Sequence, residues 1–206
     1  MNRNSQGQLK DVIKQEYVKC AADPIYFLKK YCLIQHPIKG KIPFQLYDFQ
    51  EKTVEDFVQH RFNIILKARQ LGISTLTAGY SLWMMTFHSD KNILVIATKQ
   101  DTAKNLVTKV RVMHANLPSW LKQKCVEDNK LSLRYINGSQ VKAVASGEEA
   151  GRSEALSLLI LDEAAFIDKI EPIWAAASQT LSTGGQCIAL STPNGIGNWF
   201  HKTWVG

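Results

Sequence analysis

The hydrophobic pattern divides the chain into a helical opening and a longer stretch in which short apolar runs alternate with helical segments. Residues from about 8 to 35 carry apolar side chains at helical spacing, and Asp23-Pro24 is a start signal for a second helix among them. A break containing proline and glycine follows at residues 36–40, and helical spacing resumes from Tyr47 to His60. The opening of the chain is therefore predicted to be helical.

From Phe62 onward, the apolar runs are short and predict strands. These runs are Phe62–Leu66, Ile93–Ala97, Leu131–Ile136, Val141–Ala145, Leu156–Leu161 and Cys187–Leu190. Alternation of strands with helices is typical of a parallel-type α/β sheet covered by helices. The continuous apolar run Leu156–Leu161 suits a central strand buried on both faces. After the first strand, Trp83, Met84 and Met85 are expected on the core face of a helix.

Composition narrows the class of protein. With 206 residues, 45% of them hydrophobic, the chain can bury one sizeable core. Its four cysteines are far apart and form no C-x-x-C pair, which argues against a zinc ribbon or a disulfide framework and favours a reducing compartment. No apolar run approaches the roughly 20 residues of a bilayer span, and the polar start is unlike a signal peptide. We therefore expect neither export nor membrane insertion.

The chain is basic. A formal charge of +7 and a pI near 9.2 favour a polyanionic partner, because cationic surfaces attract phosphate backbones by counterion release. A merely basic globular protein is the alternative. Lys99, Lys104, Lys109 and Arg111 cluster in one predicted helix, where a solvated face is favoured over a DNA-facing patch.

The turn after the first predicted strand carries part of a phosphate-binding sequence. In G-x-x-x-x-G-K-[ST], backbone N–H groups cradle phosphates, the lysine reaches the terminal phosphates and the hydroxyl binds Mg²⁺. Gly72 and Ser74 fit this pattern, but Ile73 stands where the lysine is expected and Lys67 where the first glycine is expected. Either the cation has moved to the other end of the loop, or there is no nucleotide site.

A second element favours a site. The apolar run ending at Leu161 is followed by Asp162 and Glu163. At the carboxyl end of a central strand, Asp162 would hold Mg²⁺ through water, and Glu163 would orient and deprotonate the attacking water. The order and spacing match a phosphate-loop ATPase, with ATP and Mg²⁺ as cofactors. The alternative is that the two acids cap the next helix.

Three weaker signals have structural alternatives. Thr192, after the last apolar run, could sense the terminal phosphate, although Pro-Asn-Gly beside it is also good turn chemistry. Phe49 could stack on adenine and Gln50 could pair with its edge, or both could simply begin an amphipathic helix. Asp168 and Glu171 have capping-box spacing, and we favour that structural role.

Together, these elements resemble the ATPase domain of the large terminase subunit, the DNA-packaging motor of tailed bacteriophages. The resemblance spans roughly residues 44 to 200. It is carried by Ala68-Arg69-Gln70-Leu71-Gly72, by Leu161–Ile167 as a Walker B motif, by Ser191-Thr192-Pro193 as a coupling motif, and by Phe49 and Gln50. It implies a P-loop NTPase fold of the ASCE/RecA-like type, a mainly parallel sheet flanked by helices. Residues 1–43 would form an N-terminal helical entry subdomain, and residues 44–206 the ATPase core.

The resemblance also implies roles for individual residues. Phosphates would lie on the loop residues Lys67, Gln70, Gly72, Ile73, Ser74 and Thr75. A variant of the family moves the lysine to the start of the loop, so Lys67 would replace the cation lost at position 73, with Arg69 as a second candidate. Ser74 and Asp162 would organise Mg²⁺. Thr192 would couple product release to motion.

Arg152 has two interpretations. It lies in Ala150-Gly151-Arg152-Ser153, which resembles the segment where some relatives carry an arginine that completes the site of a neighbouring subunit. The alternative is a solvated loop residue.

The family's partners are double-stranded DNA, a portal protein and a small terminase subunit, with subunits assembled in a homo-oligomeric ring. The isolated domain would be a monomer. The implied location is the host cell cytoplasm, with transient docking at the portal vertex of the procapsid. Large terminases normally continue into an RNase-H-like nuclease domain, so we expect no DNA cleavage from these residues.

Two other functions stay open. Asp162–Ala165 and Ser191–Pro193 also resemble motifs of DEAD-box-type helicases, which need a second RecA-like domain. A degenerate nucleotide-binding scaffold would explain Ile73. The presence of both Asp162 and Glu163 argues against it, since a dead site has no use for a residue that activates water.

Overall fold

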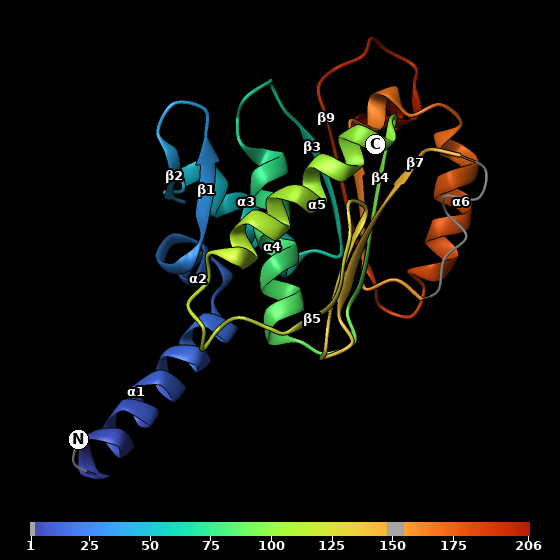
Figure 1. Cartoon of the computed structure of the whole chain (residues 1–206). Helices are drawn as coiled ribbons and strands as arrows, with labels where there is room; N and C mark the ends of the chain where they lie inside the picture. Colours follow the sequence, from blue (N-terminus) through green and yellow to red (C-terminus); the bar gives the residue numbers. More distant parts are fainter. Residues whose placement is uncertain (1–2, 148–154) are drawn as a thin grey trace.

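The computed structural model describes residues 3–147 and 155–206 as a β-sheet between two layers of helices (Figure 1). The described residues form a seven-stranded sheet in the order β3-β9-β8-β4-β7-β6-β5. Its strands are β3 (Phe62–Leu66), β4 (Asn92–Ala97), β5 (Cys125–Asp128), β6 (Ser132–Tyr135), β7 (Gln140–Ala145), β8 (Leu158–Asp162) and β9 (Gln186–Ser191). The first five in the sheet order pair in parallel, and β6 and β5 are antiparallel. The predicted fold class, a mainly parallel α/β sheet, is confirmed.

Helices cover both faces of the sheet. They are α1 (Arg3–Ala22), α2 (Pro24–Tyr31), α3 (Asp48–Gln59), α4 (Ile73–Phe87), α5 (Gln100–Ala115), α6 (Ile170–Thr180) and α7 (Trp199–Val205), with the short 3₁₀ helix η1 (Ala164–Phe166). Figure 1 shows α3, α4 and α5 on one side of the sheet and α6 on the other. In β4, Ile93 and Val95 join the core under α4 and α5, while Leu94 and Ile96 join the core under α6. Strand alternation thus fills both cores.

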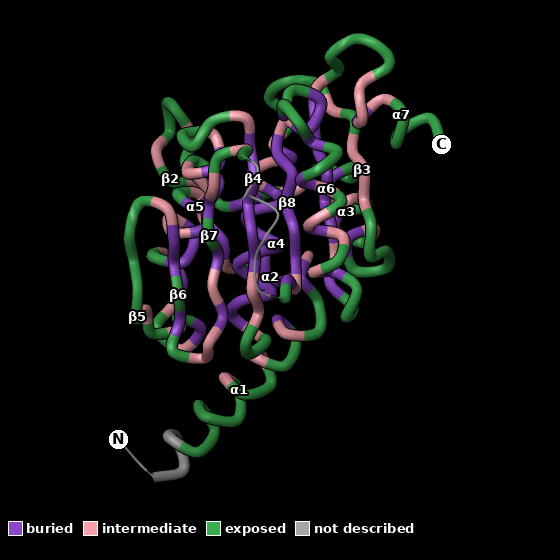
Figure 2. The backbone as a smooth tube through the Cα atoms, turned by 90° about the vertical axis from the view of Figure 1, so that its right-hand side faces the viewer, coloured by how far each residue is buried: buried purple, intermediate pink, exposed green. Residues whose placement is uncertain are grey.

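The middle of the sheet is buried, as Figure 2 shows for β4 and β8. Each residue of β8 is buried, which confirms the central strand predicted from its apolar run. Trp83, Met84 and Met85 of α4 are buried in the first core, also as predicted. By contrast, most of α1 is exposed and extends away from the sheet (Figures 1 and 2).

The opening of the chain is only partly helical. Asp23 accepts a hydrogen bond from the backbone N–H of Tyr26 at 3.0 Å and Pro24 opens α2, so the predicted helix start is confirmed. The helix prediction is wrong beyond Tyr31, where the strands β1 (Leu33–His36) and β2 (Gly40–Pro43) form an antiparallel hairpin. Short apolar runs fit a strand or a helix equally well, and here the chain turns extended at Cys32.

Two further details correct the sequence analysis. The strand β5 was not predicted, because its acidic residues are poor strand formers and its edge position is exposed. The capping role of Asp168 and Glu171 is wrong, since α6 begins after Lys169, whose φ of 54° occupies the cap position without a side-chain hydrogen bond to the helix. Among the described residues, no helix combines the length and apolar character needed to cross a membrane.

Parallel pairing places several strand ends at one edge of the sheet. Leu66 of β3 is level with Ser191 of β9, Leu190 is level with Asp162 of β8, and Asp162 is level with Ala97 of β4. The connections that follow β3, β8 and β9 therefore meet at the carboxyl edge. This edge is where open α/β sheets bind their ligands.

Candidate nucleotide site

The turn between β3 and α4 is shaped to receive an anion. The backbone N–H of Lys67 donates to the carbonyl of Ser191 at 2.9 Å, which fixes the start of the turn to β9. Gln70 and Gly72 have φ values of 63° and 72°, so the chain reverses sharply into α4. The first helical bond of α4 runs from Leu76 to the Gly72 carbonyl. The N–H groups of residues 73–75 precede that bond and stand at the positive end of the helix.

A cavity of about 180 Å³ lies against this turn. Its lining residues are Lys67, Ala68, Gln70, Leu71, Gly72, Ile73, Ser74, Thr75 and Lys109. A larger cavity of about 540 Å³ lies beside the amino ends of β4 and β8, with Arg61, Tyr80 and Ser157 among its lining residues. That cavity is at the opposite edge of the sheet and contains none of the predicted site residues.

Glu163 is held by the loops on both sides of it. Its Oε1 accepts a hydrogen bond from Lys67 Nζ at 2.6 Å, and its Oε2 accepts from the backbone N–H and the hydroxyl of Thr192 at 3.2 and 3.1 Å. Burial alone would raise the pKa of Glu163, but the bonds from Lys67 and Thr192 outweigh burial and lower this pKa. The carboxylate is therefore ionised at neutral pH.

Asp162 is more deeply buried and lies near a hydroxyl. Its Oδ1 is 3.5 Å from Ser74 Oγ, at the end of β8. Burial raises the pKa of Asp162, while the charge of Lys67 opposes that rise. One carboxylate and one hydroxyl are the oxygen ligands that Mg²⁺ takes from a protein when phosphates and waters complete its shell. The residues present thus fit the predicted metal.

The structure separates the two candidate cations. The side chain of Lys67 is 9% exposed and lines the cavity, whereas Arg69 is exposed on the turn and is not among the lining residues. Ile73, at 4% exposure, packs into the core between the sheet and the helices α4 and α5. Its side chain serves packing, so only its backbone N–H can serve a phosphate.

Gln50 supports the loop from behind. Its Nε2 donates to the carbonyl of Leu71 at 2.9 Å, and its Oε1 accepts from the backbone N–H of Tyr47 at 3.1 Å. Phe49 is 44% exposed, and its ring stacks on that of Tyr47 with centroids 5.8 Å apart. An adenine-binding role for Phe49 and Gln50 stays a prediction. Arg152 lies outside the described residues.

Sequence reasoning did not assign two residues of this region to the site. Ser191 accepts the backbone N–H of Ala165 at 3.1 Å, which fixes the turn after Glu163. Lys109 lines the cavity and is half-buried, so the prediction of a solvated helix face is wrong for it. A signal was present: Lys109 lies three residues after Leu106 and four before Met113, and both are buried. That spacing places Lys109 at the border of the buried stripe.

Solved phage large terminases share this fold. The large terminase ATPase domain of Thermus phage P74-26 is 22% identical, with a TM-score of 0.62 over 77% of this chain and 69% of that one. The large terminase of bacteriophage HK97 is 18% identical, with a TM-score of 0.71 over 90% of this chain and 40% of that one. For the large terminase of a thermophilic bacteriophage in complex with ADP, the values are 15%, 0.62, 78% and 42%. The chain thus spans about two fifths of these two longer terminases.

The UvsW helicase of bacteriophage T4 also has this fold. It is 14% identical, with a TM-score of 0.60 over 89% of this chain and 64% of the helicase. The fold alone therefore does not separate a terminase from a helicase. The separation comes from the sequence, because residues 64–206 match the family described as terminase large subunit, T4-like-virus type, N-terminal. This match covers more than half of the chain, and the chain belongs to that terminase large subunit family.

Proposed function

We propose that this domain hydrolyses ATP and that hydrolysis drives double-stranded DNA into a procapsid. The observation that carries the proposal is the meeting of Lys67, Asp162 and Glu163 beside the open amino end of α4. A cation, a buried carboxylate near a hydroxyl, and an ionised second carboxylate are the groups that phosphoryl transfer to water requires. The complex of the thermophilic phage terminase with ADP supports a nucleotide as the ligand.

The loop and the start of α4 bind the phosphates. The N–H groups of residues 73–75 donate to phosphate oxygens, and the positive end of the helix favours their charge. Ser74 and Asp162 hold Mg²⁺, which neutralises charge on the phosphate oxygens when it is bound. Lys67 Nζ lies 2.6 Å from Glu163 and is placed to exchange that carboxylate for a phosphate oxygen.

Glu163 then acts as the general base. Once Lys67 has turned to the phosphates, the carboxylate is free to orient water and accept its proton. Thr192 keeps Glu163 in place through two hydrogen bonds. Because Thr192 follows β9 and leads toward α7, a change at Glu163 is passed to this connection, which makes Thr192 the coupling residue.

The partners follow from charge and from the family. A net charge of +7 supports DNA as the polyanion. Portal protein, small terminase subunit and a ring of identical subunits complete the working motor in the host cytoplasm, and Arg152 acts on a neighbouring site in that ring. Residues 1–43 form an entry subdomain, and residues 44–206 the ATPase core.

Phosphate release tests the proposal. With saturating ATP and Mg²⁺, Glu163→Gln should lower the rate by about 10²-fold or more while ATP still binds, because the general base is lost. Glu171→Gln, an exposed acid in α6, is the matched control and should keep the wild-type rate. Linear duplex DNA should raise the wild-type rate. Equal rates for wild type and Glu163→Gln would refute the enzyme, and a rate indifferent to DNA would remove DNA from the proposal.

A further inference from the structure

A second cation faces the phosphate loop from the opposite side. Lys109, on α5, lines the 180 Å³ cavity together with the loop and the first turn of α4. It also borders a smaller cavity with Thr75 and Thr108, which places it beside the start of α4. Because Lys67 reaches the cavity from the end of β3 and Lys109 from α5, the two lysines flank the loop.

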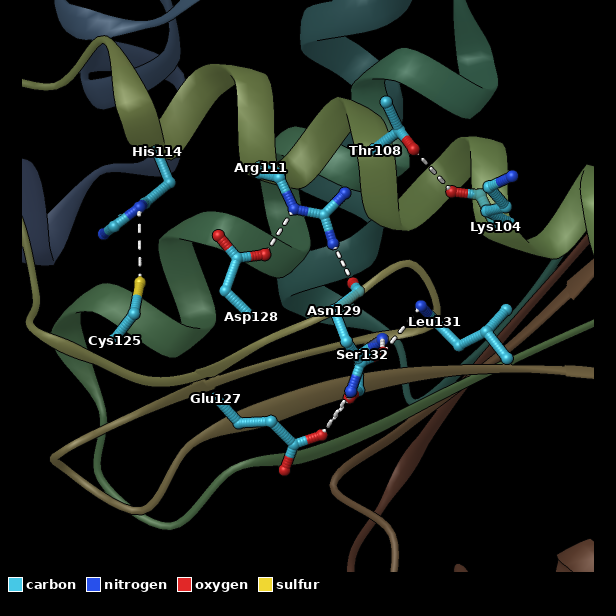
Figure 3. Close-up of polar contacts among 10 residues, drawn as sticks. All are labelled: Lys104, Thr108, Arg111, His114, Cys125, Glu127, Asp128, Asn129, Leu131 and Ser132. Carbon is cyan, nitrogen blue, oxygen red and sulfur yellow. Dashed lines mark hydrogen bonds and ion pairs between the residues drawn. The ribbon is translucent and has the colours of Figure 1, made fainter.

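The position of Lys109 is fixed by its helix. Leu106 and Met113, on the same side of α5, are buried against the core. Two residues further on, Arg111 donates to Asp128 at 2.6 Å and to the carbonyl of Asn129, which ties α5 to the β5–β6 hairpin (Figure 3). His114, on the next turn, contacts the carbonyl of Gln123 at 2.9 Å. With α5 held on these contacts, Lys109 cannot leave the loop by a movement of the helix alone.

The charge of Lys109 is available to a ligand. Within the part of the chain that the structure describes, Lys109 forms no ion pair or hydrogen bond, whereas Lys67 is paired with Glu163 at 2.6 Å. The charge of Lys109 also reaches Asp162, whose pKa it acts to lower. A half-buried ammonium without a carboxylate partner, facing a loop of free N–H groups, favours an anion.

We propose that Lys109 donates to a phosphate oxygen of the bound nucleoside triphosphate and supplies, with Lys67, the charge that Ile73 cannot. This inference rests on the proposed nucleotide site and deepens it. Duplex DNA is the other source of phosphate. The nucleotide is favoured because the cavity that Lys109 lines is bounded by the phosphate loop itself.

Binding of ATP, ADP and AMP with Mg²⁺, measured by calorimetry, tests Lys109. Lys109→Met keeps the length of the side chain and removes its charge, so ATP should bind at least about tenfold more weakly, as expected for loss of a charge-assisted hydrogen bond. The loss should shrink from ATP to ADP to AMP, because fewer phosphates reach α5. Lys109→Arg should recover most of the ATP affinity. Lys104→Met, beside Asp101 on the same helix, is the matched control and should bind like wild type.

The outcomes separate the two proposals. If wild type binds ATP and Lys109→Met binds it equally well, the role of Lys109 is overturned while the nucleotide site stands. The same holds if Lys109→Met weakens duplex DNA binding and leaves ATP affinity unchanged. If wild type itself binds no ATP, the proposed function fails together with this inference. Equal thermal melting of wild type and Lys109→Met excludes misfolding as the cause of weak binding.

Discussion

Lys67 and Glu163 hold each other in the structure. The ammonium is almost buried and the carboxylate 28% exposed, and 2.6 Å separates Lys67 Nζ from Glu163 Oε1. A paired charge at such a site costs little, whereas either partner left alone would be poorly solvated. Nucleotide phosphates would replace the carboxylate as the partner of Lys67. The pair therefore keeps both groups ionised while the loop has no ligand.

Replacing Lys67 by Met should raise the pKa of Glu163. The bond from Lys67 lowers this pKa against the effect of burial, so its removal leaves burial opposed mainly by Thr192. A lowered pKa contributes stability at neutral pH, and this contribution is lost as the pH falls through the folded-state pKa. Acid destabilisation should therefore begin at a higher pH in the variant.

NMR titration of the Glu163 carboxyl carbon measures this shift. Lys104→Met should leave the Glu163 titration unchanged, since Lys104 belongs to α5 and lies near Asp101. The same Lys67→Met protein should release no phosphate while remaining folded. An unchanged Glu163 titration in Lys67→Met would contradict the pairing.

The sequence indicates Asp162 and Glu163 clearly and leaves Lys109 hidden. Two acids after a fully apolar strand have a defined place, because strand ends of a parallel sheet share an edge. Lys109 is one of several basic residues in α5, and only the packing of that helix beside the loop distinguishes it. Likewise, the residue numbers alone could not choose between Lys67 and Arg69. The turn geometry brings Lys67 to the cavity and leaves Arg69 exposed.

At the scale of elements, the β3–α4 turn depends on a left-handed residue. Gly72 has a φ of 72°, and a Cβ built on it would lie 2.7 Å from Nε2 of Gln50. The Gln50 amide could move away only by losing its bond to the carbonyl of Leu71. The conformation of the turn and the support from α3 are therefore linked at this position.

Gly72→Ala should destabilise the protein more than Gly40→Ala does. Gly40, in the β1–β2 hairpin, has a similar φ of 70° and open space around a built Cβ, so its variant measures conformational strain alone, roughly 1–2 kcal/mol. At Gly72, about 1 kcal/mol is added for the lost Gln50 bond. Urea unfolding gives both values. Equal losses would show that Gln50 does not brace the loop, and a Gln50→Ala background should remove the difference.

Other elements show where sequence patterns stop. Asp23-Pro24 fixes the start of α2 by local chemistry, and that start could be predicted. The hairpin β1–β2 and the edge strand β5 could not, because their pairing partners, not their own residues, decide their conformation.

At the scale of the whole molecule, the sheet brings together residues that are far apart in the chain. Lys67 and Glu163 are separated by 96 positions and meet because β3, β9 and β8 are neighbours in parallel register. The same fold occurs in terminases and in a helicase, so the sheet supplies the place and the loop residues supply the chemistry. The central claim is that this place binds a nucleoside triphosphate through Lys67.

A crystal structure of the chain with Mg²⁺ and a slowly hydrolysed ATP analogue tests that claim most directly. We expect the triphosphate on the N–H groups of residues 73–75, with Lys67 Nζ turned from Glu163 to a phosphate oxygen and Mg²⁺ at Ser74 and Asp162. A saturated crystal with no nucleotide on the loop, or a bound triphosphate with Lys67 still 2.6 Å from Glu163, would contradict it.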